Sequence, residues 1–217
     1  MTPPAKLAIG LLFTGCAGFI DAVGFVELGG YFISFMSGNT TRLGTSIAHG
    51  EWAAAALPVA LVIMFFAGGF AGSLIALSNK RWGSTAVLGL VLAVVLASVG
   101  LSLAGFSTSE AMIALAAAGG AQNAVLPPVG AAKLGTTFVT GTLFAASQDL
   151  ARAVRGEAPL WRWAQHALVW GSLCAGAVVG ALADRSWGIP ALLAPAAIYL
   201  CFLVDFAVRA ASRPSGH

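Results

Sequence analysis

The residues best suited to chemistry are a carboxylate and an amide at equivalent points of two similar segments. Asp21 lies in the stretch AGFIDAV (17–23), and Asn123 takes the matching position of GGAQNAV (119–125). A carboxylate two-thirds of the way along a membrane helix is costly to bury and is usually functional, binding substrate, a proton or a cation. The alternative is a structural carboxylate that caps a nearby helix or pairs with Arg42. Because Asn123 is uncharged, only one half of the chain would carry a coupling ion.

A second set of polar residues occurs at the predicted starts of two short helices. The stretch 31–48 (YFISFMSGNTTRLGTSIA) returns in weaker form as 134–151 (LGTTFVTGTLFAASQDLA), with Gly38 aligned on Gly141. Each copy runs from β-branched and aromatic residues, typical of a strand, into a Ser/Thr-Gly pair where a helix N-cap is expected. Bare backbone amides at a helix start favour an anion or the electron-rich end of a polar solute. The alternative is ordinary capping and close packing at glycine.

These patterns give one set of candidate substrate-binding residues from both halves. Arg42 is a candidate charge partner for Asp21 or for an anion, and an outward-facing solvated arginine is an equal alternative. The predicted substrate-binding residues are Asp21, Ser37, Gly38, Asn39, Thr40, Asn123, Thr140, Gly141 and Thr142.

Composition identifies an integral membrane protein. Of 217 residues, 59% are hydrophobic and 9% charged, and the mean hydropathy is +0.89, whereas a soluble domain carries roughly a quarter charged residues. The net charge of +3 is better explained by membrane orientation than by nucleic acid binding. Cys16, Cys174 and Cys201 all lie in apolar runs and predict no disulfide framework. His49 and His166 have no ligand-like neighbours, so no metal or cofactor is expected.

Six segments are long enough to cross about 30 Å of hydrocarbon at about 20 residues each. They are residues 7–28, 52–78, 85–105, 110–130, 163–183 and 189–210. If both short helical segments dip into the membrane and return, all of the 11 lysines and arginines except Arg42 and Arg185 fall on the cytoplasmic side. If both cross, Lys80, Arg81 and Lys133 join Arg185 outside. The first arrangement is therefore predicted, with both termini cytoplasmic and the protein in the bacterial inner (plasma) membrane.

The predicted fold is an all-α membrane protein forming one domain over residues 1–217. It consists of two inverted three-helix repeats, about 7–105 and 110–210, each with a re-entrant strand-plus-half-helix segment. AGGFAG (67–72) echoes AGAVVG (175–180) in support, although chance small-residue runs are the alternative. Close helix approach is expected at these glycines, either within the chain or in a homodimer. The glycines are Gly68, Gly72, Gly176 and Gly180.

The remaining charged residues predict structural roles and no enzymatic activity. Asp149 and Arg152 have the i,i+3 spacing of a surface ion pair, and Asp205 and Arg209 have the i,i+4 spacing of a structural pair in the last turns of the last span. Ser37 lacks the sequence context of an intramembrane serine protease, and no HExxH, P-loop or GxGxxG motif occurs.

The stretch from Asp21 and Ala22 to SGNT (37–40) resembles the YoaK family of bacterial membrane proteins, and FVTGTL (138–143) matches that family's second signature. The resemblance covers nearly the whole chain. It implies a six-span inner-membrane protein of the kind described as a permease, and it assigns no binding or catalytic residue.

The expected function is a small membrane transporter or channel for a small polar or anionic solute, bound at the midplane between two half-helix N-termini. The alternative is a membrane scaffold or accessory subunit without transport of its own. An Asp21 exposed to a wet cavity favours transport, and an Asp21 sealed against protein groups favours the scaffold.

Overall fold

The computed structural model describes residues 4–126 and 139–212. Within these ranges the chain is helical between short connections and contains no strand. The elements are α1 (Pro4–Glu27), α2 (Met36–Ala48), α3 (Trp52–Ser78), α4 (Gly83–Leu103), α5 (Thr108–Gln122), α6 (Val139–Val154), α7 (Trp161–Trp187), the 3-10 helix η1 (Ile189–Leu192) and α8 (Leu193–Ser212).

Five helical segments among the described residues are long and apolar enough to cross a membrane. They are Lys6–Glu27, Trp52–Ser78, Gly83–Leu103, Trp161–Trp187 and Ile189–Ser212. This confirms an all-α integral membrane protein. Helix α5 covers the first part of the sixth predicted span, 110–130. Its 15 residues extend about 23 Å at 1.5 Å per residue, and residues 127–130 of the span lie outside the described ranges.

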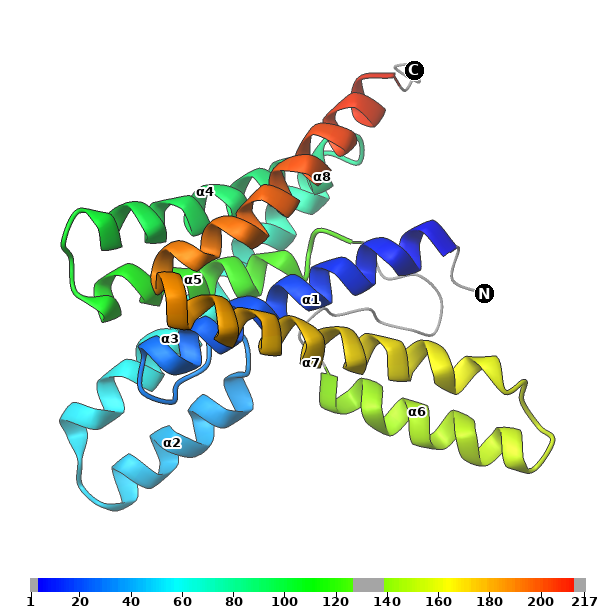
Figure 1. Cartoon of the computed structure of the whole chain (residues 1–217), viewed down its shortest axis with the longest axis horizontal. Helices are drawn as coiled ribbons and strands as arrows, with labels where there is room; N and C mark the ends of the chain where they lie inside the picture. Colours follow the sequence, from blue (N-terminus) through cyan, green and yellow to red (C-terminus); the bar gives the residue numbers. More distant parts are fainter. Residues whose placement is uncertain (1–3, 127–138, 213–217) are drawn as a thin grey trace.

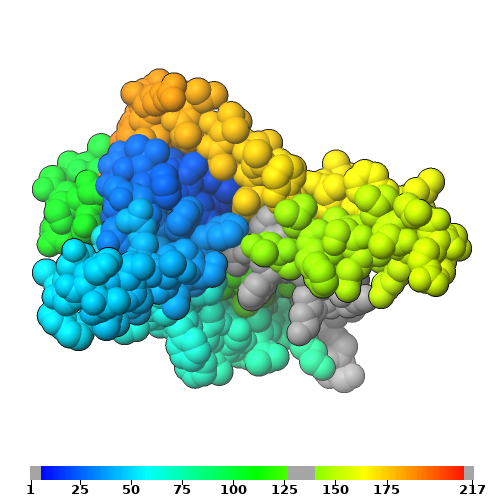
Figure 2. Space-filling view, turned by 90° about the horizontal axis from the view of Figure 1, so that it is seen from below, coloured from blue at the N-terminus to red at the C-terminus, as the bar shows by residue number. Residues whose placement is uncertain are grey.

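Helices α2 and α6 are shorter than a membrane crossing. They contain 13 and 16 residues, about 20 and 24 Å, against about 30 Å of hydrocarbon. Each forms a hairpin with the long helix that follows it, α2 with α3 and α6 with α7. The two hairpins point away from each other, and the N-terminal ends of α2 and α6 face the centre (Figures 1 and 2).

The two halves interlock through glycine, because α1 packs on α7 and α3 packs on α5. A Cβ atom added to Gly68 would lie 2.0 Å from the carbonyl oxygen of Ala117, and one added to Gly176 would lie 2.0 Å from that of Gly15. Gly15 and Ala117 are equivalent positions in the alignment that matches Asp21 with Asn123. The same backbone contact is therefore made twice, once in each direction between the halves.

The second glycine of each pair repeats this relation, with Gly72 against Ala121 and Gly180 against Phe19. The sequence leaves two alternatives for the glycine face, internal contact or dimer contact. All four glycines contact helices of the same chain, so this face serves contacts within the chain.

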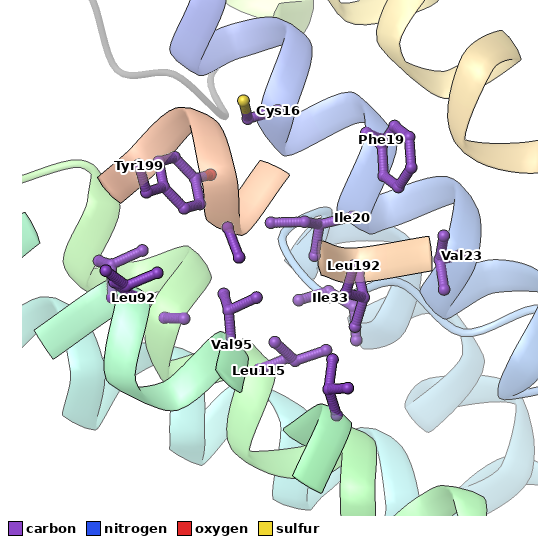
Figure 3. Packing of buried hydrophobic residues seen from close by; sticks show 14 of the residues in the cluster. Cys16, Phe19, Ile20, Val23, Ile33, Leu92, Val95, Leu115, Leu192 and Tyr199 are labelled. Atoms are coloured by element: carbon purple, nitrogen blue, oxygen red, sulfur yellow. The ribbon is translucent and has the colours of Figure 1, made fainter. Parts of the chain in front are cut away.

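Buried apolar side chains meet where α1, α4, α5, η1 and α8 converge (Figure 3). A polar link crosses this core. The amide nitrogen of Gln122 donates to the carbonyl oxygen of Phe13 at 2.8 Å, and the Tyr199 hydroxyl donates to the amide oxygen of Gln122 at 2.7 Å. Because each partner is satisfied, the link fixes α5 against α1 and α8 without an unpaired buried group.

The predicted strand before the first short helix is wrong. Residues 31–35 are irregular, and α2 begins at Met36, with Phe35 as its N-cap residue and no side-chain cap. The N-cap predicted at Ser37 is therefore also wrong, since this residue already lies in the first turn. The second predicted lead-in, before α6, lies outside the described residues up to position 138.

The glycine contact gives a direct test. Gly176→Ala is expected to destabilise the purified protein by about 2 kcal/mol, because its methyl group would overlap the backbone of α1. Gly171→Ala is the matched control, since it lies in the same helix and a Cβ atom added there would have no described atom within 4 Å. Thermal unfolding in detergent measures both, and equal melting temperatures for the two variants would contradict the contact.

Candidate functional site

Asp21 is buried in α1, with 7% of its surface exposed, and holds the irregular segment before α2. One carboxylate oxygen accepts hydrogen bonds from the backbone amides of Ile33 at 2.8 Å and Ser34 at 2.7 Å. The other accepts a hydrogen bond from the Ser34 hydroxyl. Every donor comes from the same turn, so the carboxylate supplies the acceptors that a neighbouring strand or helix would otherwise provide.

Asn39, in the first turn of α2, holds the same segment from its other side. The residue is 0% exposed. Its amide oxygen accepts from the backbone nitrogen of Phe32 at 3.0 Å, and its amide nitrogen donates to the carbonyl oxygen of Phe32 at 2.7 Å. Both backbone polar groups of Phe32 are thus satisfied by a single side chain. The ring of Phe32 would also lie 2.8 Å from a Cβ atom added to Gly38, which explains the glycine there.

Arg42 does not pair with Asp21, so that predicted charge partnership is wrong. Its guanidinium lies 4.7 Å from the ring centroid of Tyr31, a cation–π contact, and passes close to Gly30. Asp21 is instead bonded by neutral hydrogen-bond donors. Arg42 is exposed, in keeping with the outward-facing alternative.

The start of α2 offers fewer bare amides than the sequence suggests. The backbone amides of Met36, Gly38 and Asn39 donate to the carbonyl oxygens of Ser34 and Phe35. Among the described residues, only the Ser37 amide in this first turn has no acceptor. The side chains of Ser37 and Thr40 reach the surface, and the Thr40 hydroxyl donates to its own helix, at the carbonyl oxygen of Met36, 2.8 Å away.

The candidates of the second half lie on α5 and α6. Asn123 follows α5 and donates to the carbonyl oxygen of Gly119 at 3.1 Å, among other contacts. Thr140 and Gly141 are exposed in the first turn of α6, and Thr142 is half-buried. The structure thus brings Asp21 together with Asn39 around one segment. Among the described residues α2 and α6 make no direct contact.

Sequence reasoning missed the environment of Asp149. The sequence predicts a surface pair with Arg152, and the pair is present at 3.4 Å. However, Asp149 is only 6% exposed and also faces α7, with Arg162 at 3.7 Å and His166 at 3.6 Å. The helical i,i+3 rule reveals partners on the same helix only. No group of three or more potential metal ligands occurs in the described part of the chain.

The exposed pair on α8 is as predicted, with Arg209 donating to Asp205 at 2.8 Å. Ser34 was also missed as a hydrogen-bond partner of Asp21. Its signal in the sequence is weak, because a single serine within FISF reads as part of an alternating strand.

Asp21→Asn tests the holding role of the carboxylate. We expect a loss of about 2 kcal/mol in stability, because the charge-assisted bonds from the Ile33 and Ser34 amides become weaker neutral bonds and the Ser34 hydroxyl must turn to accept from the new amide nitrogen. Asp205→Asn, an exposed carboxylate, is the control and should change stability by less than about 0.5 kcal/mol. A double-mutant cycle with Ser34→Ala should show a coupling of about 1 kcal/mol. Additive effects would contradict the direct bond.

Asn39→Asp should be more damaging, at about 3 kcal/mol, since it removes the donor to Phe32 and buries a charge without a partner. Thr40→Ala, one residue further along α2, should stay within about 0.5 kcal/mol, because that hydroxyl is exposed and bonds only its own helix. Thermal unfolding of both variants measures the two losses. Similar losses would contradict a stabilising role of the hydrogen bonds between Asn39 and Phe32.

Comparison with known proteins agrees with this membrane architecture. The chain is 30% identical over 189 residues to the UPF0700 transmembrane protein RA0705 of Rhizobium meliloti (strain 1021), which covers 87% of this chain and 80% of that relative. No solved structure matches the chain. The expected membership of a transmembrane family is confirmed. The similarity to the YoaK family in particular remains a resemblance. Residues 9–204 match the family described as "Protein of unknown function (DUF1275)", and the chain belongs to this family.

Proposed function

We propose that the protein is a small membrane transporter or channel for a small polar or anionic solute. The observation that carries the proposal is the pair of short helices, α2 and α6, whose N-terminal ends face each other across the centre (Figures 1 and 2). Broken or half-length helices that meet inside a membrane are characteristic of secondary transporters. Backbone that leaves helical geometry there must be buried in protein or line a wet cavity.

The arrangement proposed for the membrane has six crossings and two re-entrant segments. Helices α1, α3, α4, α5, α7 and α8 cross, and α2 and α6 each run from the middle to one surface. Helices α1 and α5 run in opposite directions in Figure 1, which supports an inverted relation of the halves. We propose the bacterial inner membrane, both termini cytoplasmic, and no enzymatic activity.

The geometry changes the roles within the predicted site. Asp21 and Asn39 use their polar atoms to hold the segment before α2, so we propose that they position the half-helix. The exposed residues at the two helix starts, Ser37, Thr40 and Thr140, then line the solute site together with the open position at Gly141.

The scaffold alternative has one observation in its favour. Asp21 is sealed and bonded to protein groups, which is the arrangement expected of a structural carboxylate. Asp21 is therefore no longer evidence for ion-coupled transport. A scaffold role does not explain why the N-terminal ends of α2 and α6 face the centre, and for this reason we favour transport. A homodimer through the four glycines is not part of the proposal, since they are used within the chain.

Flux into proteoliposomes tests the proposal, with chloride, nitrate, phosphate, formate, urea and glycerol as probes. At least one probe should enter faster than in empty liposomes. Gly141→Trp should reduce that flux at least tenfold, because the indole would fill the space at the start of α6. Gly44→Trp is the control: it lies in the outer half of α2, where an added Cβ atom would also have no described atom within 4 Å, and should transport normally.

Thermal unfolding of both tryptophan variants confirms that each is folded before its flux is interpreted. Normal flux in Gly141→Trp would place the pathway elsewhere. Absence of flux for every probe would favour the scaffold.

A further inference from the structure

Asp184 presents an unexplained buried atom near the end of α7. The residue is 8% exposed, and its Oδ1 is the one buried side-chain nitrogen or oxygen without a hydrogen-bond partner in the described part of the chain. Buried polar atoms are nearly always paired, so an orphaned carboxylate oxygen indicates a missing donor or ligand.

A second carboxyl group lies beside it. Glu27, the last residue of α1, has its carboxyl within hydrogen-bonding reach of Asp184. The same Glu27 carboxyl lies over the corner after α7, where Oε1 would be 3.3 Å from a Cβ atom added to Gly188. Gly188 has φ +58°, a conformation that favours glycine. Two acidic side chains from different halves of the molecule therefore meet at a tight turn.

Both carboxyls also sit at helix C-terminal ends, where the exposed carbonyl groups carry partial negative charge. Two carboxylates in contact cannot both remain ionised without a counter-charge. Among the described residues no ion pair joins a cation to either carboxyl: the basic residues that form ion pairs do so with Asp149, Glu157 and Asp205. Arg185, next to Asp184 in the sequence, is exposed, and η1, which packs on both α1 and α7, contains no titratable residue.

We propose that Glu27 and Asp184 form a proton-binding site in which one shared proton joins the C-terminal ends of α1 and α7. The proton sits between one oxygen of each group, so the pair carries a single negative charge and the orphaned oxygen gains its partner. When the proton leaves, both groups are negative and repel each other.

This site has no counterpart at the position related to it by the repeat. Glu27 matches Val129 in the alignment that pairs Asp21 with Asn123, and Asp184 matches Ala76 in the one that pairs Gly176 with Gly68. Neither partner therefore has an acidic counterpart, and the pair is not required by the repeated fold. It links the two helices that interlock the halves, and the proposal stands whether or not the chain transports a solute.

Infrared difference spectroscopy and thermal unfolding of the full-length protein in detergent, between pH 5 and pH 9, test the site. The folded pair holds a proton that the unfolded chain has lost, so stability is highest in acid and falls as the pH rises through the titration of the pair. The melting temperature should then fall by roughly 3 °C per pH unit in that window. A protonated-carboxyl band should disappear over the same range.

Glu27→Gln supplies a permanent donor to Asp184, so the band and this part of the pH dependence should both be lost, with the high melting temperature retained in alkali. Asp184→Asn should act in the same way, and Glu27→Gln covers the case in which that variant fails to fold. Glu51→Gln, an exposed carboxyl at the end of another hairpin, is the control and should behave as wild type.

An unchanged pH profile and carboxyl band in Glu27→Gln would overturn the proposal. So would restoration of wild-type stability in alkali by Na⁺ or Ca²⁺, since the ligand would then be a metal cation.

Discussion

Backbone groups without helical partners must be satisfied by the protein itself, and the arrangement of this chain depends on that constraint. The connection 28–35 between α1 and α2 lies outside regular structure, so its amides and carbonyls have no ladder to join. Asp21 and Asn39 provide the substitutes, one from each flanking helix. Their bonds fix where α2 begins and in which direction it leaves the centre. The half-helix geometry on which the transport proposal rests therefore follows from two buried side chains.

The fold also requires that the long helices approach one another closely. Interlocked hairpins need α7 to cross α1, and α3 to cross α5, at backbone contact distance, which only small residues permit. Gly68 and Gly176 meet this need at equivalent places. Such packing leaves the short helices on the outside of the crossing, each against its own long partner. The central location of their N-terminal ends is thus a consequence of the glycine contacts.

Hydropathy predicts the membrane class and most of the spans, because a run of apolar residues is a local property of the sequence. The interruption that makes α2 short is also visible, since polar residues within 37–41 exclude a lipid-facing span. The sequence does not show which groups hydrogen-bond to one another. The cost of burying Asp21 is plain from the sequence, but its donors come from a segment 12 and 13 residues further along the chain, and only the fold reveals them. The strand predicted from FISF failed for the same reason, because its backbone bonds to side chains.

The distribution of acidic groups argues that the two halves have taken different roles on one framework. Asp21 aligns with an amide, and Glu27 and Asp184 align with apolar residues, whereas Asp149 is surrounded by Arg152, Arg162 and His166 in the second half alone. The glycine contacts are made in both halves, so this part of the packing does not depend on the acidic groups. Each of these carboxylates is costly to place in a membrane domain and has no acidic counterpart in the other repeat, so the two halves use their acidic groups for different tasks. For Asp21 that task is to hold backbone; for Asp149 it is to tie α6 to α7.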